Sequence, residues 1–156
     1  MVNNTYYNYE TPYGIIIIES DGNAIISIKT ENSIKPRGKK IADKLTDKAA
    51  DQLDEYFKGK RKQFDIPLNM QGTKFQNLVW KALCEIPYGE TRSYKDIAAA
   101  TGNPKACRAV GLANNKNTVW IIVPCHRVIG SNGTLTGYGG GLEMKQRLLD
   151  LESNNY

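Results

Sequence analysis

The fold of the second half of the chain is decided by residues 93–114, which read SYKDIAAATGNPKACRAVGLAN. Ser93, followed three residues later by Asp96, forms a capping box and predicts the start of a helix. Thr101-Gly102 ends this helix, because glycine readily takes the left-handed conformation that follows a helix. A second helix follows after a tight turn, so the stretch predicts a helix-turn-helix.

The second helix is expected over residues 105–114, with Asn103 as its N-cap and Pro104 at its first position. It is rich in alanine and glycine, and Arg108 is the one long polar side chain in its middle. A helix that reads bases in the major groove usually carries several such side chains. Small residues suit either a close approach to the narrow minor groove or packing against another helix, and both interpretations stay open.

The segments on either side of this pair also have clear patterns. Thr73 and Gln76 form another capping box, ahead of a helix over residues 75–83 that ends in a turn at residues 87–90. After the pair, residues 120–123 read Trp-Ile-Ile-Val and predict a short buried strand. This strand leads directly into a Pro-Cys-His-Arg segment.

The first third of the chain has the pattern of a sheet. Residues 13–19 and 24–29 are β-branched runs joined through Asp21-Gly22, which is a strong hairpin signal. A helix is expected near residues 47–57. Residues 64–68 predict a short edge strand, since the proline within them lacks an N–H for the ladder.

Together these segments predict an α+β fold. A small N-terminal β-sheet and helix domain spans residues 1–68, and a mostly helical C-terminal domain with the helix-turn-helix spans residues 69–156. The net charge of +5 permits a nucleic-acid partner without demanding one. No apolar run approaches the roughly 20 residues that span a bilayer, and no signal peptide is recognised. We therefore expect a cytoplasmic, prokaryotic-type protein without a membrane partner.

The most reactive combination of residues surrounds Cys125, which precedes the only histidine, His126. A nearby imidazole can lower the pKa of a thiol and activate it as a nucleophile. For an isolated pair, a buried structural cysteine beside a chance histidine is the simpler interpretation. The other cysteines, Cys84 and Cys107, are too scattered for a disulfide framework or a metal site, so we predict no metal.

The residues around this pair make it specific. Val-Pro-Cys-His-Arg-Val at residues 123–128 resembles the active-site signature of the O6-alkylguanine-DNA alkyltransferases, also called methylated-DNA–protein-cysteine methyltransferases. The resemblance covers about residues 72–152. Its further motifs are Ile86–Glu90, Ser93-Tyr94, Gly102–Ala106, Arg108–Gly111, Asn117 and Tyr138–Leu142.

The resemblance implies a DNA-repair protein. Such a protein transfers the O6-alkyl group of damaged guanine, mainly methyl, and that of O4-methylthymine to its own cysteine. The base is first flipped out of double-stranded DNA, which is contacted through the minor groove. Transfer is irreversible and stoichiometric, because a thioether is a poor leaving group. The resemblance thus implies an enzyme that works once, as a monomer and without a cofactor.

The family's catalytic roles fall on five residues of this sequence. Cys125 would be the nucleophile and alkyl acceptor, and His126 would act as a base through a bound water. Glu152 would orient the imidazole, which resembles the logic of a Ser-His-Asp triad. Asn117 would tie the recognition helix to the active-site turn, and Tyr94 would donate a hydrogen bond to the leaving guanine.

The resemblance also implies DNA contacts and a substrate pocket. Arg108 would enter the base stack and fill the gap left by the flipped nucleotide, while the main-chain carbonyls of Cys125 and Val128 would accept from the guanine amine. The other implied DNA-binding residues are Tyr94, Lys95, Asn103, Ala106, Ala109, Gly111 and Ser131. The implied pocket is lined by Trp120, Val128, Tyr138, Gly139, Gly140 and Lys145.

Three features depart from the family pattern. No cysteine precedes Cys84 and no histidine precedes His126, which argues against the N-terminal zinc site of some relatives. Trp120 is bulkier than the small residue or proline expected there, which bears on the size of the alkyl group. Gly139 replaces the usual serine of the closing loop, so only its main chain can bind.

Three other functions fit parts of the pattern. An alkyltransferase-like protein binds damaged DNA without repairing it, but lacks the acceptor cysteine that Cys125 supplies. A helix-turn-helix regulator would not need Pro-Cys-His-Arg or Glu152. A cysteine hydrolase using Cys125 and His126 would regenerate its thiol. One stable methyl group on the cysteine would distinguish repair from all three.

Overall fold

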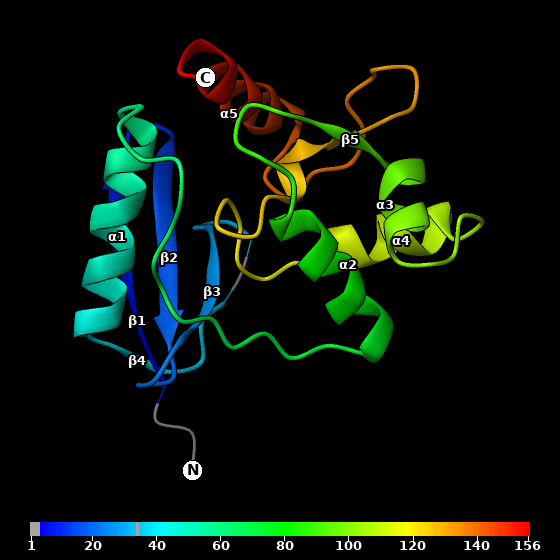
Figure 1. The fold of residues 1–156 in the computed structure, drawn as a ribbon. Helices are drawn as coiled ribbons and strands as arrows, with labels where there is room; N and C mark the ends of the chain where they lie inside the picture. Colours follow the sequence, from blue (N-terminus) through cyan, green and yellow to red (C-terminus); the bar gives the residue numbers. More distant parts are fainter. Residues whose placement is uncertain (1–3, 34) are drawn as a thin grey trace. The chain divides into compact units, whose positions relative to one another are not determined.

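The computed structural model describes residues 4–33 and 35–156, and the chain divides into two units between Met70 and Gln71. The first unit holds a sheet and one helix, and the second holds the remaining helices (Figure 1). The predicted α+β class is therefore confirmed.

The sheet of the first unit has the strand order β3-β2-β1-β4. The predicted hairpin is confirmed: β2 (Gly14–Ser20) pairs antiparallel with β3 (Ile25–Thr30), with a bulge near Ser20. The Asp21 carboxylate closes the turn by accepting the N–H groups of Asn23 and Ala24, both at 2.8 Å. β4 (Lys39–Lys40) runs parallel to its neighbour.

The strand between β2 and β4 was not expected from the sequence. β1 (Thr5–Thr11) pairs along its whole length with β2, and all seven of its residues are polar or tyrosine rather than aliphatic. Its side chains are mostly half-buried, so the strand lacks the apolar run that identifies β2. Tyrosine and threonine nevertheless favour strands, because they fit a pleated, half-buried surface.

Helix α1 (Lys44–Phe57) covers one face of this sheet and begins three residues before the predicted start (Figure 1). Asp43 caps it by accepting the N–H of Thr46 at 2.8 Å. The helix buries Ala49, Leu53, Tyr56 and Phe57. The strand predicted over residues 64–68 is wrong: only Leu68 forms a bridge, to Ile25 of β3, because the adjacent proline cannot continue a ladder.

The second unit is built from α2 (Lys74–Cys84), α3 (Tyr94–Ala100), α4 (Cys107–Asn115) and α5 (Leu142–Asn154). Both predicted capping boxes are confirmed. Gln76 N–H donates to Thr73 Oγ1 at 3.1 Å, and Asp96 N–H donates to Ser93 Oγ at 3.0 Å. Helices α3 and α4 pack against each other, so the helix-turn-helix is confirmed.

The start of α4 was placed too early. Asn103 organises a turn instead of capping the helix: its side chain accepts the N–H of Lys105 at 3.3 Å, and its carbonyl accepts that of Ala106 at 3.0 Å. The helix then begins at Cys107, with no side-chain cap at Ala106. The polar turn residue and the following proline stop the chain from entering the helix directly.

The strand predicted over residues 120–123 is also wrong. Ile122 N–H donates to the carbonyl of Trp120 at 2.9 Å, and Val123 N–H donates to Val119 at 3.1 Å, so the segment is a tight turn. Ile121 has a φ of +75°, which is rare and strained for a β-branched residue. The apolar run is buried as expected, but it bends because Asn117 holds its end.

Candidate active site

Cys125 opens a short 3-10 helix, η1 (Cys125–Arg127), and is only 3% exposed. Two asparagines near the end of α4 hold the chain on either side of Pro124. Asn117 Nδ2 donates to the carbonyl of Val123 at 2.8 Å, and Asn114 Nδ2 donates to that of Cys125 at 3.4 Å. After η1 the chain enters β6 (Val128–Ile129), which pairs with β5 (Arg92–Ser93). The nucleophile candidate is thus fixed to the helix-turn-helix.

His126 is fully buried, and its Nε2 lies 2.6 Å from Oε2 of Glu152 on α5. A carboxylate in this position fixes the tautomer with the proton on Nε2, so Nδ1 keeps a lone pair. That buried Nδ1 has no hydrogen-bond partner within residues 4–33 and 35–156. Burial lowers the pKa of His126 despite the opposing pull of Glu152, so the imidazole is neutral at pH 7.

Arg127 also belongs to this group, although the sequence reasoning gave it no role. Its Nε donates to Glu152 Oε1 at 2.7 Å, and its Nη2 donates to Oε2 at 3.0 Å. Burial raises the pKa of Glu152, but the hydrogen bonds and charges of His126 and Arg127 outweigh burial and hold that pKa well below its usual range. The sequence signal that could have identified Arg127 is its position within the mostly apolar stretch at residues 121–129. Such a position predicts a buried arginine, and a buried cation needs a partner.

Lys145 is fully buried on α5 and connects two parts of the site. Its Nζ donates to the carbonyl of Val128 at 2.5 Å and to that of Thr136 at 2.8 Å. Burial lowers the pKa of Lys145 to about 8, against the attraction of a negatively charged Cys125. The Val128 carbonyl thus accepts a hydrogen bond from Lys145, and a carbonyl oxygen can accept two.

The loop at residues 131–140 packs on aromatic side chains. Tyr94 donates from its hydroxyl to the carbonyl of Thr136 at 3.1 Å, and the rings of Trp120 and Tyr138 lie 5.3 Å apart. A Cβ at Gly139 would lie 2.6 Å from Trp120 Cζ2, closer than real contacts allow. The indole thus explains why glycine stands where the family pattern has serine.

The predicted DNA-binding residues lie on α3, α4 and the loops beside them. Tyr94, Ala106 and Gly111 are half-buried. The exposed members of the set are Lys95, Asn103, Arg108, Ala109 and Ser131. Their exposure leaves them accessible to a ligand, and their assignment as DNA contacts stays a prediction.

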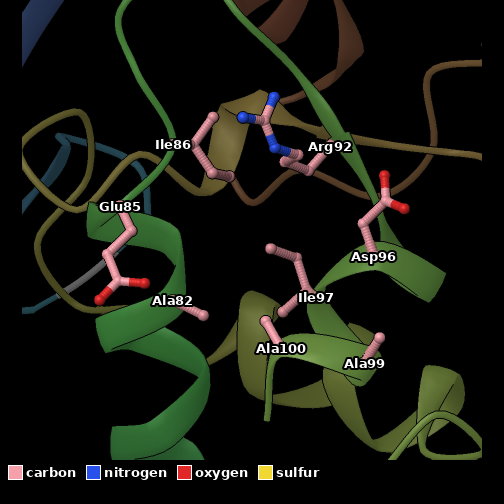
Figure 2. Close-up of a pocket in the computed structure, with 8 residues that line it drawn as sticks. All are labelled: Ala82, Glu85, Ile86, Arg92, Asp96, Ile97, Ala99 and Ala100. Atoms are coloured by element: carbon pink, nitrogen blue, oxygen red, sulfur yellow. The ribbon is translucent and has the colours of Figure 1, made fainter.

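A cavity of about 500 Å³ lies elsewhere in the second unit, between the end of α2, β5 and α3 (Figure 2). None of the predicted site residues lines it. Its lining residues are Ala82, Glu85, Ile86, Arg92, Asp96, Ile97, Ala99 and Ala100. Around Cys125, the predicted pocket residues Trp120, Val128 and Lys145 are buried, and Tyr138 is half-buried.

Neither a metal-binding cluster nor a membrane-spanning helix occurs in the described ranges, 4–33 and 35–156. In these ranges no group of three histidine, cysteine, aspartate or glutamate residues is placed to hold a metal ion. No helix there has the length and apolar character needed to cross a membrane.

These features define a protein with a buried cysteine–histidine–glutamate site fixed to a helix-turn-helix. Residues 74–154 match the model of the 6-O-methylguanine DNA methyltransferase DNA-binding domain, and residues 4–70 match the ribonuclease-like domain of the same family. The chain belongs to the 6-O-methylguanine DNA methyltransferase family, as the motifs around Cys125 predicted.

Individual relatives agree with this assignment. The chain is 51% identical to a methylated-DNA–protein-cysteine methyltransferase of Methanosarcina mazei, over 96% of this chain and 98% of the relative. It is 47% identical to the constitutive enzyme of that name in Bacillus subtilis, over 98% of both. It also resembles the crystal structure of Mycobacterium tuberculosis OGT in complex with DNA, with 45% identity, a TM-score of 0.92, and coverage of 97% of this chain and 94% of that chain.

Proposed function

We propose that this protein repairs double-stranded DNA by moving the O6-alkyl group of guanine, mainly methyl, and that of O4-methylthymine onto Cys125. The observation that carries the proposal is the buried contact between Glu152 and His126, directly after the buried Cys125. Glu152 fixes Nε2 of His126, which leaves the lone pair of Nδ1 available to take the proton of the Cys125 thiol. Family membership supplies the substrate class.

In this mechanism His126 removes the thiol proton through a water, and the Cys125 thiolate attacks the alkyl carbon in line. The new S–C bond forms as the C–O bond breaks, and its electron pair stays on the guanine O6. Tyr94 then donates a proton or hydrogen bond to the leaving base, for which it must release its bond to Thr136. The thioether that remains cannot easily leave, so each molecule, acting as a monomer, reacts once.

The lesion lies inside the duplex, so the base must first be flipped into the site, which costs a few kcal/mol. On α4 the exposed Arg108 stands beside the exposed Ala109 and near the half-buried Gly111, and these small residues suit a close approach in the minor groove. Lys95, Asn103 and Ser131 would contact the DNA backbone, and Ala106, Ala109 and Gly111 would allow the close approach. The pocket would be formed by Trp120, Val128, Tyr138, Gly139, Gly140 and Lys145.

The direct test is a titration of the protein with a large excess of labelled O6-methylguanine duplex. Label should move to the protein and reach a plateau near one equivalent. Continued turnover would favour a hydrolase, and binding without transfer would favour a protein that only recognises damage. Either result would contradict the proposal.

Arg108→Ala should separate base flipping from chemistry. Arg108 is exposed on α4 and can replace the stacking of the flipped nucleotide. Loss of about 1.4–3 kcal/mol of flipping energy would slow transfer from duplex DNA roughly tenfold to a hundredfold. Transfer from free O6-methylguanine should stay near the wild-type rate, because no base has to be flipped. Lys105→Ala, three residues earlier in the exposed turn before α4, is the control for general loss of charge. Equal losses on both substrates would mean that Arg108 is not the inserted residue.

Trp120→Ala should widen the range of alkyl groups. The indole fills the space beneath Gly139 and Gly140, so its removal opens the pocket wall. Steric discrimination in a pocket is worth about 1–3 kcal/mol, so the rate with O6-benzylguanine relative to O6-methylguanine should rise about tenfold to a hundredfold. Trp80→Phe, in α2, is a matched control for loss of a buried indole. An unchanged ratio in Trp120→Ala would remove this residue from the pocket.

A further inference from the structure

The Glu152 carboxylate is shared between two cationic or potentially cationic partners. Oε2 lies 2.6 Å from His126 Nε2 and also accepts from Arg127 Nη2 at 3.0 Å. Oε1 accepts from Arg127 Nε at 2.7 Å and from the N–H of Gly89 at 3.3 Å. The guanidinium thus binds both oxygens, in the forked geometry that makes such pairs strong.

Arg127 is itself held in place on its far side. Its Nη1 donates to the carbonyl of Ile86 at 2.8 Å, and its guanidinium lies 5.7 Å from the centre of the Tyr88 ring. Gly89, which donates to the carboxylate, belongs to the same turn and has a φ of +83°. The segment from Ile86 to Gly89 therefore fixes both members of the Arg127–Glu152 pair.

We propose that Arg127 is a positioning residue that binds both oxygens of the Glu152 carboxylate and so keeps His126 a neutral base protonated on Nε2. A buried carboxylate that faced the imidazole alone would favour the imidazolium form. An imidazolium has no lone pair on Nδ1 and cannot take the thiol proton. Because Arg127 neutralises much of the carboxylate charge, Glu152 orients the ring without protonating it. This role rests on the proposed function of His126.

The other groups around His126 do not replace Arg127. The buried Lys145 cation on α5 also disfavours the imidazolium, but it donates its hydrogen bonds to the carbonyls of Val128 and Thr136. A Cys125 thiolate would favour the imidazolium. Tyr138 stays neutral, because burial raises its pKa. Arg127 combines a positive charge with direct contact to both carboxylate oxygens.

Nuclear magnetic resonance of the imidazole tests this role on the full chain without DNA. The sequence contains a single histidine, so the ¹⁵N signals of the ring belong to His126 without further assignment. In the wild type they should report the neutral, Nε2-protonated ring through pH 7 and below. In Arg127→Met the pKa of His126 should rise by about one to three pH units. Adding Glu152→Gln to that variant should abolish the rise, because the charge that attracts the proton is gone.

Arg127→Lys provides a second, milder variant. Lysine keeps the positive charge but lacks the guanidinium group that binds both carboxylate oxygens. The pKa of His126 should therefore rise less than in Arg127→Met. The pH at which transfer to Cys125 is half-maximal should rise in parallel in both variants. If Arg127→Met does not fold, the Lys variant decides: an upward shift supports the proposal, and an unchanged titration overturns it. A wild-type protein that transfers methyl groups while the variants titrate unchanged would refute the Arg127 role and leave the proposed function standing.

Discussion

Cys125→Ala should abolish alkyl transfer completely while leaving binding to lesion-containing duplex nearly unchanged. The side chain is 3% exposed and lies at the start of η1, where the main-chain carbonyl of Cys125 accepts from Asn114 and its N–H donates to the carbonyl of Val123. Removing one sulfur from this position leaves those contacts in place. The exposed residues proposed to contact DNA lie on α3, α4 and their loops, so they are not changed. Transfer is measured with labelled duplex, and binding by a mobility or anisotropy assay at fixed salt.

Cys84→Ala and Cys107→Ala are the matched controls. Cys84 ends α2 and Cys107 begins α4, and neither has a histidine beside it in the sequence. Both variants should transfer as the wild type does. Residual transfer in Cys125→Ala, or loss of transfer in either control, would place the acceptor on a different sulfur.

His126→Ala should slow transfer by a factor of about 10² to 10⁴, the usual contribution of a positioned general base. Unlike Arg108→Ala, it should slow the reaction with duplex DNA and with free O6-methylguanine alike, because it acts on the thiol and not on base flipping. Glu152→Gln should slow both reactions less, because the imidazole stays in place and loses only its charged partner. Rates are compared in single-turnover experiments on variants shown to be folded. A loss confined to duplex DNA would mean that His126 serves recognition.

The pH dependence of the wild type follows from the buried imidazole. Burial puts the pKa of His126 below its ordinary value of 6.5, so the ring still accepts a proton at pH values where a free histidine is half protonated. The transfer rate should therefore hold as the pH falls to 6.5 and decrease only below it. The folded protein also binds fewer protons here than the unfolded chain, so stability should decrease as the pH falls below 6.5. A rate inflection above pH 6.5 would contradict the neutral state.

The local signals in the sequence predicted most of the fold. The two capping boxes and the Asp21-Gly22 hairpin depend on neighbouring residues only, and each formed as expected. β1 depends on its pairing with β2, and the turn at residues 120–123 depends on a side chain outside the apolar run. Pairing with β2 makes a strand of a polar, tyrosine-rich segment. The side chain of Asn117 bends an apolar run that would otherwise suit a strand.

The candidate site was predicted from its motif, but its electrostatics were not. The contact between His126 and Glu152 was expected from the resemblance, and the structure places them 2.6 Å apart. Arg127 was overlooked because its partners, Glu152 and the carbonyl of Ile86, lie 25 and 41 residues away in sequence. Trp120 was recognised as unusual, but its steric demand for Gly139 depends on a loop whose path the sequence does not indicate.

The central claim is that Cys125 itself receives the alkyl group. Wild-type protein is incubated with excess O6-methylguanine duplex, digested, and examined by peptide mass spectrometry. We predict one stable methyl group per molecule, on the peptide that contains Cys125, with Cys84 and Cys107 unmodified. A fully unmodified chain after the lesion has been repaired or bound, or a methyl group on another residue, would contradict the claim.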